Sequence, residues 1–479
     1  MRISLRATAV VFGLLAPCLL SAQETPTERV AAADVVNKLD ALQTSLDLPA
    51  LAARLTGPNA QRDQVVARAK QLMDTELLAM GDDITKHPEI GFKETRSVKL
   101  LTDWLKKHDF EVQMGTPGLP TAFVARYKKG KAGPNLGIIV EYDALRGTKG
   151  AFHGDQHSTQ GPIGLAAAVA VSEFLTKSGT PGTVTVYGTP GEEMMPPNAK
   201  TEMLKSKVFD GADILVRSHS TSRTSRPAAG FGTCCMNING VKYTFSGAPA
   251  HQLASWNGRN ALTAVRQLFG NIDDMRSSMR PETRIQGVIT EGGAAPNVVP
   301  DRTVADFYVR YPDEVYLAQI QDIVDNAAKA AALATGTKVK IDHYGEDRDG
   351  ISVGSLSEVA FAYMKKYGAT DVESEPGKPQ GYEETGSVSS AIPGVGFSAK
   401  TSNAPNHTYE MEADALGQVG HDGFVVDAQA MTAVLYDFAT RADYRETVKH
   451  EFQTIQGLKT EYIDALHKAY VLPKVPEPQ

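Results

Sequence analysis

Apolar residues recur at two spacings that alternate along most of the chain. Residues 30–79 carry them at helical intervals, with a turn at Gly57-Pro58, and predict a helical N-terminal extension. Beyond it, short apolar runs typical of buried strands alternate with amphipathic or Ala-rich helical stretches. The predicted strands are Thr121–Arg126, Leu136–Glu141, Thr183–Tyr187, Ile214–Arg217 and one near Val395–Ser398, and two predicted helices are Glu94–His108 and Gly161–Leu175. This alternation predicts an α/β fold with a mostly parallel sheet covered by helices on both faces.

The order of elements changes near residue 236. There the pattern becomes β-α-β-β-α-β, the order of a split ferredoxin-like α/β sandwich. The strands are Met236–Phe245, Arg284–Ile289, Thr303–Tyr311 and Lys338–His343, and the helices are Ala261–Met279 and Val315–Leu333. We therefore predict an inserted domain over residues 236–344. It interrupts an outer domain made of residues 23–235 and 345–470, and a Pro-rich tail follows at 471–479.

The first 22 residues have the pattern of a secretory signal peptide. Arg2 and Arg6 form a basic start, Ala7–Leu20 is an almost unbroken apolar run, and the small residues Ser21-Ala22 follow. The apolar run is shorter than the ~20 residues that a membrane-spanning helix needs. We expect a secreted or periplasmic protein with no membrane segment after cleavage of this peptide.

Composition and charge narrow the class of protein. Apolar residues make up 42% of the 479 residues and charged residues 22%, which excludes global disorder. The net charge of −7, with no basic run longer than Lys128-Lys129, argues against a nucleic-acid partner. Cys234 and Cys235 are adjacent, so we expect no ordinary intrachain disulfide and interpret them as two small apolar residues. A small-molecule partner is expected.

Polar side chains that can bind metals follow the predicted strands of the outer domain. They are Asp143, Asp155, His157, Glu192, Glu193, His219 and His407. The carboxyl ends of parallel strands meet in one crevice, so residues distant in sequence converge there. Two carboxylates and three imidazoles suit two divalent ions such as zinc, with manganese or cobalt as alternatives. One of the adjacent glutamates Glu192 and Glu193 would bind metal and the other would act as general base.

Several stretches resemble the metallopeptidase family that contains aminoacylase, glutamate carboxypeptidase and carnosine dipeptidase. They run in the family's order from about residue 80 to 430. They are His87–Phe92, Glu141–Leu145, Gly191–Glu193, Asp213–His219, Trp256–Leu262, Ala295–Pro300 with Arg310, and Asn406–Thr408. The closest branch resembles the aminobenzoyl-glutamate and indole-acetyl-amino-acid amidohydrolases.

The resemblance implies a role for each candidate residue. Glu192 would be the general base, the metal ligands would be Asp155, His157, Glu193, His219 and His407, and Asp143 would lie just behind the ligands. The inserted domain would form a homodimer, in which His251 reaches the partner subunit's active site and polarises the scissile carbonyl. Asn297 and Arg310 would hold the substrate, although Arg310 also fits a surface charge at a strand edge.

Two residues depart from the pattern of the closest branch. That branch has Gly-His-Ala-Cys-Gly-His where this chain has Phe152–His157, so Asp155 stands on the position of a metal-binding cysteine. Other branches use aspartate as a bridging ligand there. Arg146 replaces a proline and would reshape the pocket near the metals.

Three functional hypotheses follow. The first is a metal-dependent amidohydrolase that cleaves N-acyl amino acids or aminobenzoyl-glutamate-like amides. The second is a dipeptidase or carboxypeptidase with the same metals and base. The third is an exported binding protein or pseudoenzyme that has lost its metal site through the departures at Asp155 and Arg146.

Overall fold

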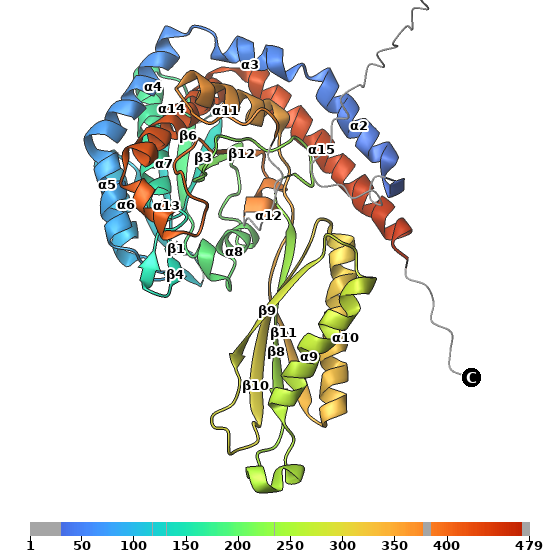
Figure 1. The fold of residues 1–479 in the computed structure, drawn as a ribbon. Coiled ribbons are helices and arrows are strands. Elements are labelled where there is room, and N and C mark those ends of the chain that lie inside the picture. Colours follow the sequence, from blue (N-terminus) through green and yellow to red (C-terminus); the bar gives the residue numbers. More distant parts are fainter. Residues whose placement is uncertain (1–29, 117, 131, 234, 377–384, 472–479) are drawn as a thin grey trace, which may run out of the picture.

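The computed structural model describes residues 30–116, 118–130, 132–233, 235–376 and 385–471. The proposed signal peptide and nearly all of the Pro-rich tail lie outside these residues. The chain forms a broad α/β domain, from which a slender inserted domain extends (Figure 1). Among the described residues, no helix is both long and apolar enough to cross a membrane.

A six-stranded sheet forms the centre of the outer domain. Its strands, in spatial order, are β1 (Glu111–Thr116), β2 (Leu119–Lys129), β6 (Gly182–Gly188), β3 (Asn135–Val140), β7 (Ile214–Ser218) and β12 (Gly394–Phe397). The four strands from β6 to β12 are parallel, and β1 and β2 pair antiparallel at one side. The predicted α/β class with a mostly parallel sheet is confirmed. Strand β1 was not predicted.

Helices cover both faces of this sheet unequally. On one face, α7 (His157–Ser178) packs against β3 and β6, and α14 (Gln418–Thr440) packs against α7. Further helices on this side are α4 (Ala60–Leu72), α5 (Leu78–Lys86), α6 (Thr95–Lys107) and α11 (Gly354–Lys366). Helix α7 approaches closely because Gly164 has no side chain; a Cβ there would lie 2.6 Å from Val140 Cγ1. The other face is covered by the short helices α8 (Ala199–Lys205) and α12 (Thr385–Ser389), over a smaller apolar cluster that includes Ile139 and Leu215.

The N-terminal extension is helical. It contains α2 (Ala33–Ser45), α3 (Leu48–Thr56), α4, a π-helical turn (Met73–Leu77) and α5. The predicted turn at Gly57-Pro58 separates α3 from α4, and Asn59 caps α4 by accepting from Arg62 N. Helix α2 packs against α15 (Ala442–Ala469), the long C-terminal helix.

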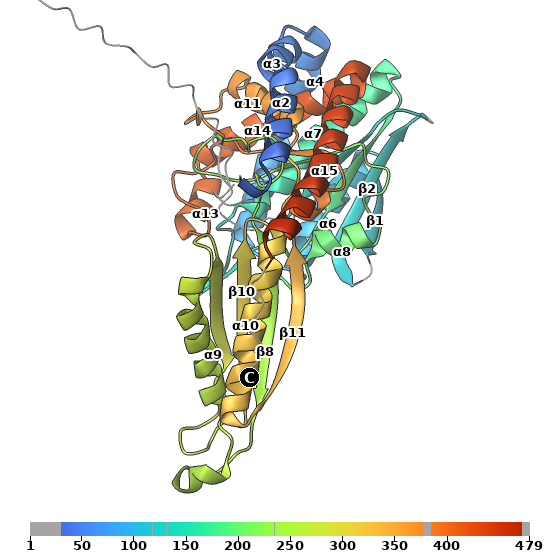
Figure 2. The same cartoon turned by 90° about the vertical axis from the view of Figure 1, so that its right-hand side faces the viewer.

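The inserted domain has the predicted β-α-β-β-α-β order. Its antiparallel sheet has the order β11 (Lys338–Asp347), β8 (Asn237–Ser246), β10 (Arg302–Tyr311) and β9 (Arg284–Glu291). Helices α9 (Ala261–Met275) and α10 (Glu314–Thr335) lie side by side along it (Figure 2). In β10, Phe307 and Val309 are buried, whereas Tyr308 and Arg310 alternate with them and are half-buried. This period of two is that of a strand with one buried face.

One sequence expectation near the inserted domain is wrong. Cys235 is disulfide-bonded, and both other cysteines of the chain lie outside the described residues. The expectation rested on the general geometry of disulfides, which does not decide the state of one particular cysteine.

Candidate metal centre and active site

The candidate ligands lie on loops and helix ends that follow the parallel strands. Asp143 follows β3, Asp155 and His157 stand at the start of α7, and Glu193 lies in the 3-10 turn Glu192–Met194 after β6. His219 follows β7, and its backbone N–H donates to Phe397 O of β12 at 2.8 Å. His407 lies just before α13 (Tyr409–Ala415). These positions converge because all four parallel strands end at the same edge of the sheet.

Asp155 is the centre of the cluster. Its Oδ2 lies 3.3 Å from His407 Nε2, 3.7 Å from His219 Nε2 and 4.0 Å from His157 Nε2. Glu193 Oε1 lies 3.6 Å from His407 Nε2. Ligand atoms about 2.0–2.2 Å from a shared ion are separated by distances of this order. The structure thus brings together all five side chains that the sequence marked as ligands, and their role in binding metal stays a prediction.

Asp143 fixes two of these side chains from behind. His157 Nδ1 donates to Asp143 Oδ1 at 3.0 Å, which leaves Nε2 turned toward Asp155. The other carboxylate oxygen, Oδ2, accepts from the backbone N–H of Glu193 at 2.9 Å. A carboxylate that orients a ligating imidazole in this way raises its basicity and fixes its tautomer.

Two buried side-chain atoms that lack hydrogen-bond partners indicate whether a cation fits among the candidate ligands. His157 Nε2 and Glu193 Oε1 are buried and make no hydrogen bond among the described residues. An unsatisfied buried polar group costs about 1–3 kcal/mol. His157 and Glu193 belong to one group with Asp155, in which one ligand atom from each residue lies within 4.8 Å of the others. Divalent ions at this position would satisfy both, so the donor set fits the metals that the sequence predicts.

The electrostatics of the cluster are those of closely spaced opposite charges. Burial raises the pKa of the Glu193 carboxyl to about 7. Burial would also raise the pKa of Asp155, but the hydrogen bond with His407 and the charges of His219 and His157 hold it below its usual range. Burial opposes charging of His157, yet the carboxylates of Glu141 and Asp143 hold its pKa well above its usual range. The site therefore favours a positive charge at its centre.

Glu141 and Lys200 form a buried ion pair beside the ligands that the sequence did not reveal. Lys200 Nζ lies 2.5 Å from Glu141 Oε1, and both side chains are fully buried. Gln160 Nε2 donates to Glu141 Oε2, which lies 3.4 Å from His157 Nε2. The sequence predicts Glu141 as the end of the strand Leu136–Glu141 and as the first residue of the resembling stretch Glu141–Leu145, but it assigns no role to this side chain. Glu141, His157 and His219 form a second group whose ligand atoms lie within 4.8 Å of one another.

The loop that carries Glu192 is held by the segment around residues 87–94. A Cβ on Gly91 would lie 2.7 Å from Gly191 Cα and 2.6 Å from Met194 Cγ, so this close approach requires a glycine. The buried Glu94 carboxylate accepts from the Gly191 backbone N–H at 2.9 Å. These contacts explain why the His87–Phe92 stretch accompanies the site, although none of its side chains is a ligand candidate.

The remaining candidates lie on the inserted domain, at its two ends. His251 and Asn297 lie close together, because the backbone N–H of Gln252 donates to Asn297 O at 3.1 Å and His251 pairs with Val298. The loops after β8 and β9 that carry them lie at the end far from the outer domain (Figure 1). Arg310 lies at the opposite end, opposite Ile238 of β8 in the strand register. Within one chain, Arg310 is therefore not brought together with His251 and Asn297. Arg146 is exposed on the hairpin formed by β4 (Leu145–Gly147) and β5 (Gly150–Phe152).

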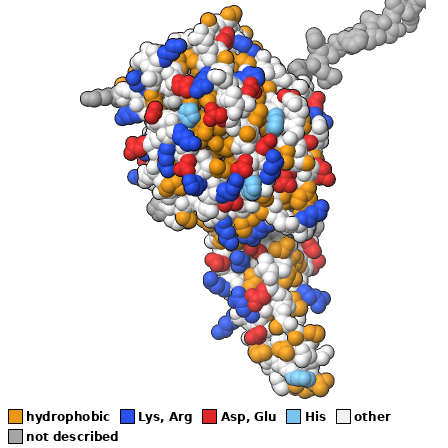
Figure 3. Space-filling view, turned by 90° about the vertical axis from the view of Figure 1, so that its left-hand side faces the viewer, with side chains coloured by type: hydrophobic (Ala, Val, Ile, Leu, Met, Phe, Trp, Pro, Cys, Tyr) orange, Lys and Arg blue, Asp and Glu red, His pale blue; other side chains and the backbone are white. Residues whose placement is uncertain are grey.

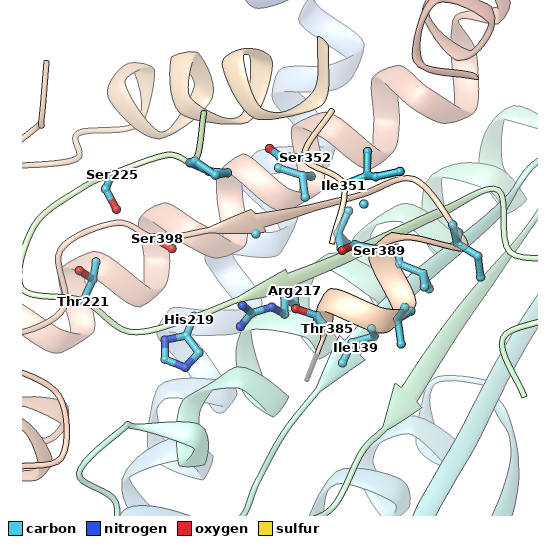
Figure 4. A pocket seen from close by; sticks show the side chains of 18 of the residues that line it. Ile139, Arg217, His219, Thr221, Ser225, Ile351, Ser352, Thr385, Ser389 and Ser398 are labelled. Atoms are coloured by element: carbon cyan, nitrogen blue, oxygen red, sulfur yellow. The ribbon is translucent and has the colours of Figure 1, made fainter. Parts of the chain in front are cut away.

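A cavity of about 520 Å³ adjoins the cluster on the side of His219 (Figure 4). Asn406 also lines it, and Asn406 Nδ2 donates to Asp155 Oδ1. Arg217 extends from β7 into this cavity, near His219 and Thr385 (Figure 4). A volume of this size is within the range of small-molecule sites.

Comparisons with known proteins agree with this architecture. Residues 236–335 match the family model for the peptidase dimerisation domain of M20 proteins. The Xaa-Arg dipeptidase of Homo sapiens is 26% identical over 78% of this chain and 88% of its own length. One of the subunits of the p-aminobenzoyl-glutamate hydrolase of Escherichia coli is 32% identical over 54% of this chain and 56% of its own. Residues 236–335 are thus a peptidase dimerisation domain of the M20 type, and the chain is similar to a dipeptidase and an amide hydrolase subunit over much of its length.

Solved structures agree with the fold of an M20 protein. A dinuclear metal-binding M20 peptidase from Bacillus subtilis superimposes with a TM-score of 0.56 and 18% identity, covering 77% of this chain and 99% of that one. The relatives indicate that this protein is a hydrolase acting on amides or peptides.

Proposed function

We propose that this protein is an exported amidohydrolase of the M20 type that uses two divalent ions, most simply zinc, to cleave N-acyl amino acids or aminobenzoyl-glutamate-like amides. One observation carries the proposal: Asp155 Oδ2 lies 3.3–4.0 Å from the Nε2 atoms of three histidines, with Glu192 next to the candidate ligand Glu193. Export rests on the predicted signal peptide.

Different residues of the chain would bind the ions, transfer protons and position the ligands. Asp155, His157, Glu193, His219 and His407 would hold the ions. Divalent ions so placed supply Lewis acidity, which polarises an amide carbonyl and makes a nearby water more acidic. The Glu192 carboxylate removes a proton from the attacking water and delivers it to the leaving nitrogen. Asp143 keeps His157 and the Glu193 backbone in position throughout.

The inserted domain would complete the site by forming a homodimer. Strand β9 is an edge of its sheet, and Val288 on that strand is 61% exposed. At the far end, Leu253 and Trp256 are 79% and 75% exposed, and hydrophobic side chains gather there (Figure 3). Exposed apolar edges of this kind mark association surfaces. His251 and Asn297 lie at this end, so they would act in the partner's site rather than in their own.

A dipeptidase is the second candidate. The observation that favours it is the match to a human Xaa-Arg dipeptidase over 88% of that protein's length. The metals, Glu192 and the dimer would serve a peptide bond equally well, and only the substrate pocket separates the two activities.

Glu192→Gln in the metal-reconstituted enzyme tests the assignment. We expect hydrolysis of aminobenzoyl-glutamate, acyl-amino acids and dipeptides to fall by about 10²–10⁴-fold while metal content stays unchanged. Glu410→Gln, at an exposed carboxylate in the first turn of α13, is the matched control. Full activity in Glu192→Gln would overturn the role of Glu192.

A further inference from the structure

The backbone on either side of Glu192 is held by a buried carboxylate. After Glu192, the N–H of Glu193 donates to Asp143 Oδ2 at 2.9 Å. Before Glu192, the N–H of Gly191 donates to Glu94 Oε1 at 2.9 Å. The direction in which the Glu192 side chain leaves this turn therefore depends on both hydrogen bonds, because together they fix the backbone that carries it.

Glu94 is itself held in place. Its side chain is fully buried, and its second oxygen, Oε2, accepts from Thr121 Oγ1 at 2.8 Å. The carbonyl of Thr121 accepts in turn from the Tyr142 hydroxyl at 2.7 Å, and Tyr142 directly precedes Asp143 in the chain. The two carboxylates that flank Glu192 thus belong to one connected network.

Close packing accompanies the hydrogen bond between Gly191 and Glu94. Gly191 has φ of +68°, and a Cβ on it would lie 2.4 Å from the Phe92 ring. Phe92 and Glu94 belong to one segment, in which the Glu89 carbonyl accepts from the Ala144 N–H at 2.9 Å. This segment therefore contacts both the loop after β3 and the turn after β6, and it keeps the two in one arrangement.

Stability alone does not favour a carboxylate at position 94. Burial, with a smaller contribution from the Asp143 charge, raises the pKa of Glu94 to about 7. A buried carboxyl group is costly unless its oxygens are hydrogen-bonded. The side chain provides two accepting oxygens in fixed directions, one of which faces the turn that carries Glu192.

We propose that Glu94 is a positioning residue for the general base: by holding the Gly191 N–H, it directs the Glu192 carboxylate toward the attacking water. The inference rests on the proposed function and deepens it. A general base must lie within hydrogen-bond reach of the proton that it removes, and a misplacement of about 1 Å can slow a reaction by about 100-fold. Because Glu94 itself does not contact substrate in this assignment, its loss should lower kcat and leave KM nearly unchanged.

Two substitutions in the metal-reconstituted protein separate positioning from a general contribution to the fold. Glu94→Met has a similar length but provides no strong acceptor, whereas Glu94→Gln keeps an accepting oxygen for Gly191. With any amide that the wild-type protein cleaves, kcat should fall by about 10- to 100-fold in Glu94→Met, with KM within about threefold and bound metal unchanged. Glu94→Gln should keep kcat within about threefold of wild type. Glu446→Met, at an exposed glutamate on α15, is the matched control.

Hydrogen exchange followed by mass spectrometry reports on the Gly191 hydrogen bond without turnover. Peptides that cover the turn after β6 should exchange about tenfold faster in Glu94→Met and at the wild-type rate in Glu94→Gln. Thr121→Val removes only the hydroxyl that holds Glu94 Oε2, so it keeps the test open if Glu94→Met does not fold. It should lower kcat by about three- to tenfold.

The outcomes separate the two proposals. Wild-type kcat in Glu94→Met, an equal loss in Glu94→Gln, or a loss of activity that follows a loss of bound metal overturns the positioning role. If exchange in the turn depends on Glu94 but the wild-type protein cleaves no amide, the proposed function fails and the hold of Glu94 on the turn stands. If the wild-type protein cleaves amides through Glu192 but neither kcat nor exchange depends on Glu94, the positioning proposal fails and the proposed function stands.

Discussion

Asp143→Asn isolates the contribution of a single oxygen atom to the metal centre. Asp143 accepts two hydrogen bonds, from His157 Nδ1 at 3.0 Å and from the Glu193 backbone N–H at 2.9 Å. Asparagine has the same shape but only one accepting oxygen. If that oxygen keeps the bond to Glu193, the amide nitrogen faces His157 Nδ1, and a donor meets a donor.

The expected loss follows from the bond that asparagine cannot make. A hydrogen bond to a charged acceptor contributes about 1.5–3 kcal/mol. Since about 1.4 kcal/mol corresponds to a factor of ten, metal affinity should fall by about 10- to 100-fold. Carboxylates behind ligating histidines have effects of this size in general.

Competition with a chromophoric chelator measures this affinity directly, and circular dichroism checks that the fold is kept. Asp210→Asn changes an exposed aspartate in the same way and serves as the control. A zinc affinity in Asp143→Asn within about threefold of wild type would refute the claim that Asp143 orients His157.

Three further changes test other parts of the structure. Lys200→Met leaves Glu141 buried without its partner at 2.5 Å, so the free energy of unfolding should fall by about 3–5 kcal/mol in denaturant titrations; a loss below about 1 kcal/mol would contradict the buried pair. Burial raises the pKa of Glu94 to about 7 from 4.5, so its stabilising contribution is complete below pH 4.5 and is lost as the pH rises through 7. Relative to Glu94→Gln, the wild-type protein should therefore lose about 3 kcal/mol of unfolding free energy between pH 4.5 and 7.5. If the difference in unfolding free energy between the two proteins does not change with pH, the raised pKa of Glu94 is contradicted. Val288→Lys on the edge strand β9 should shift a dimer toward monomers in analytical ultracentrifugation, whereas Leu333→Lys on α10 should not.

The sequence could predict that the candidate metal ligands lie close together, because their positions depend on the topology of the sheet. Asp155, His157, Glu193, His219 and His407 lie beyond the ends of parallel strands or beside them, and parallel strands end at one edge of their sheet. The alternation of short apolar runs with helical stretches was enough to place those ends. Helix boundaries were less accurate: α7 begins at His157 rather than at Gly161, because Gln156 takes the left-handed conformation with φ of 54° just before it.

Other features depend on contacts that leave no local pattern. Nothing in the sequence around Lys200 distinguishes a fully buried lysine from an exposed one, and its partner Glu141 is 59 positions away in a different element. The positions of His251 and Arg310 at opposite ends of the inserted domain follow from strand register and from how the domain projects, neither of which a spacing rule supplies. The cavity beside Arg217 likewise requires the packing of α12 over β7 and β12.

Elemental analysis of the metal-reconstituted, dialysed protein tests the central claim most directly. Asp155 Oδ2 lies within 4.0 Å of all three histidine Nε2 atoms, so both ions should depend on this one carboxylate. The wild-type protein should hold two divalent ions per chain, and Asp155→Ala should hold one at most. A wild-type protein without tightly bound metal, or Asp155→Ala with both ions retained, would contradict the account.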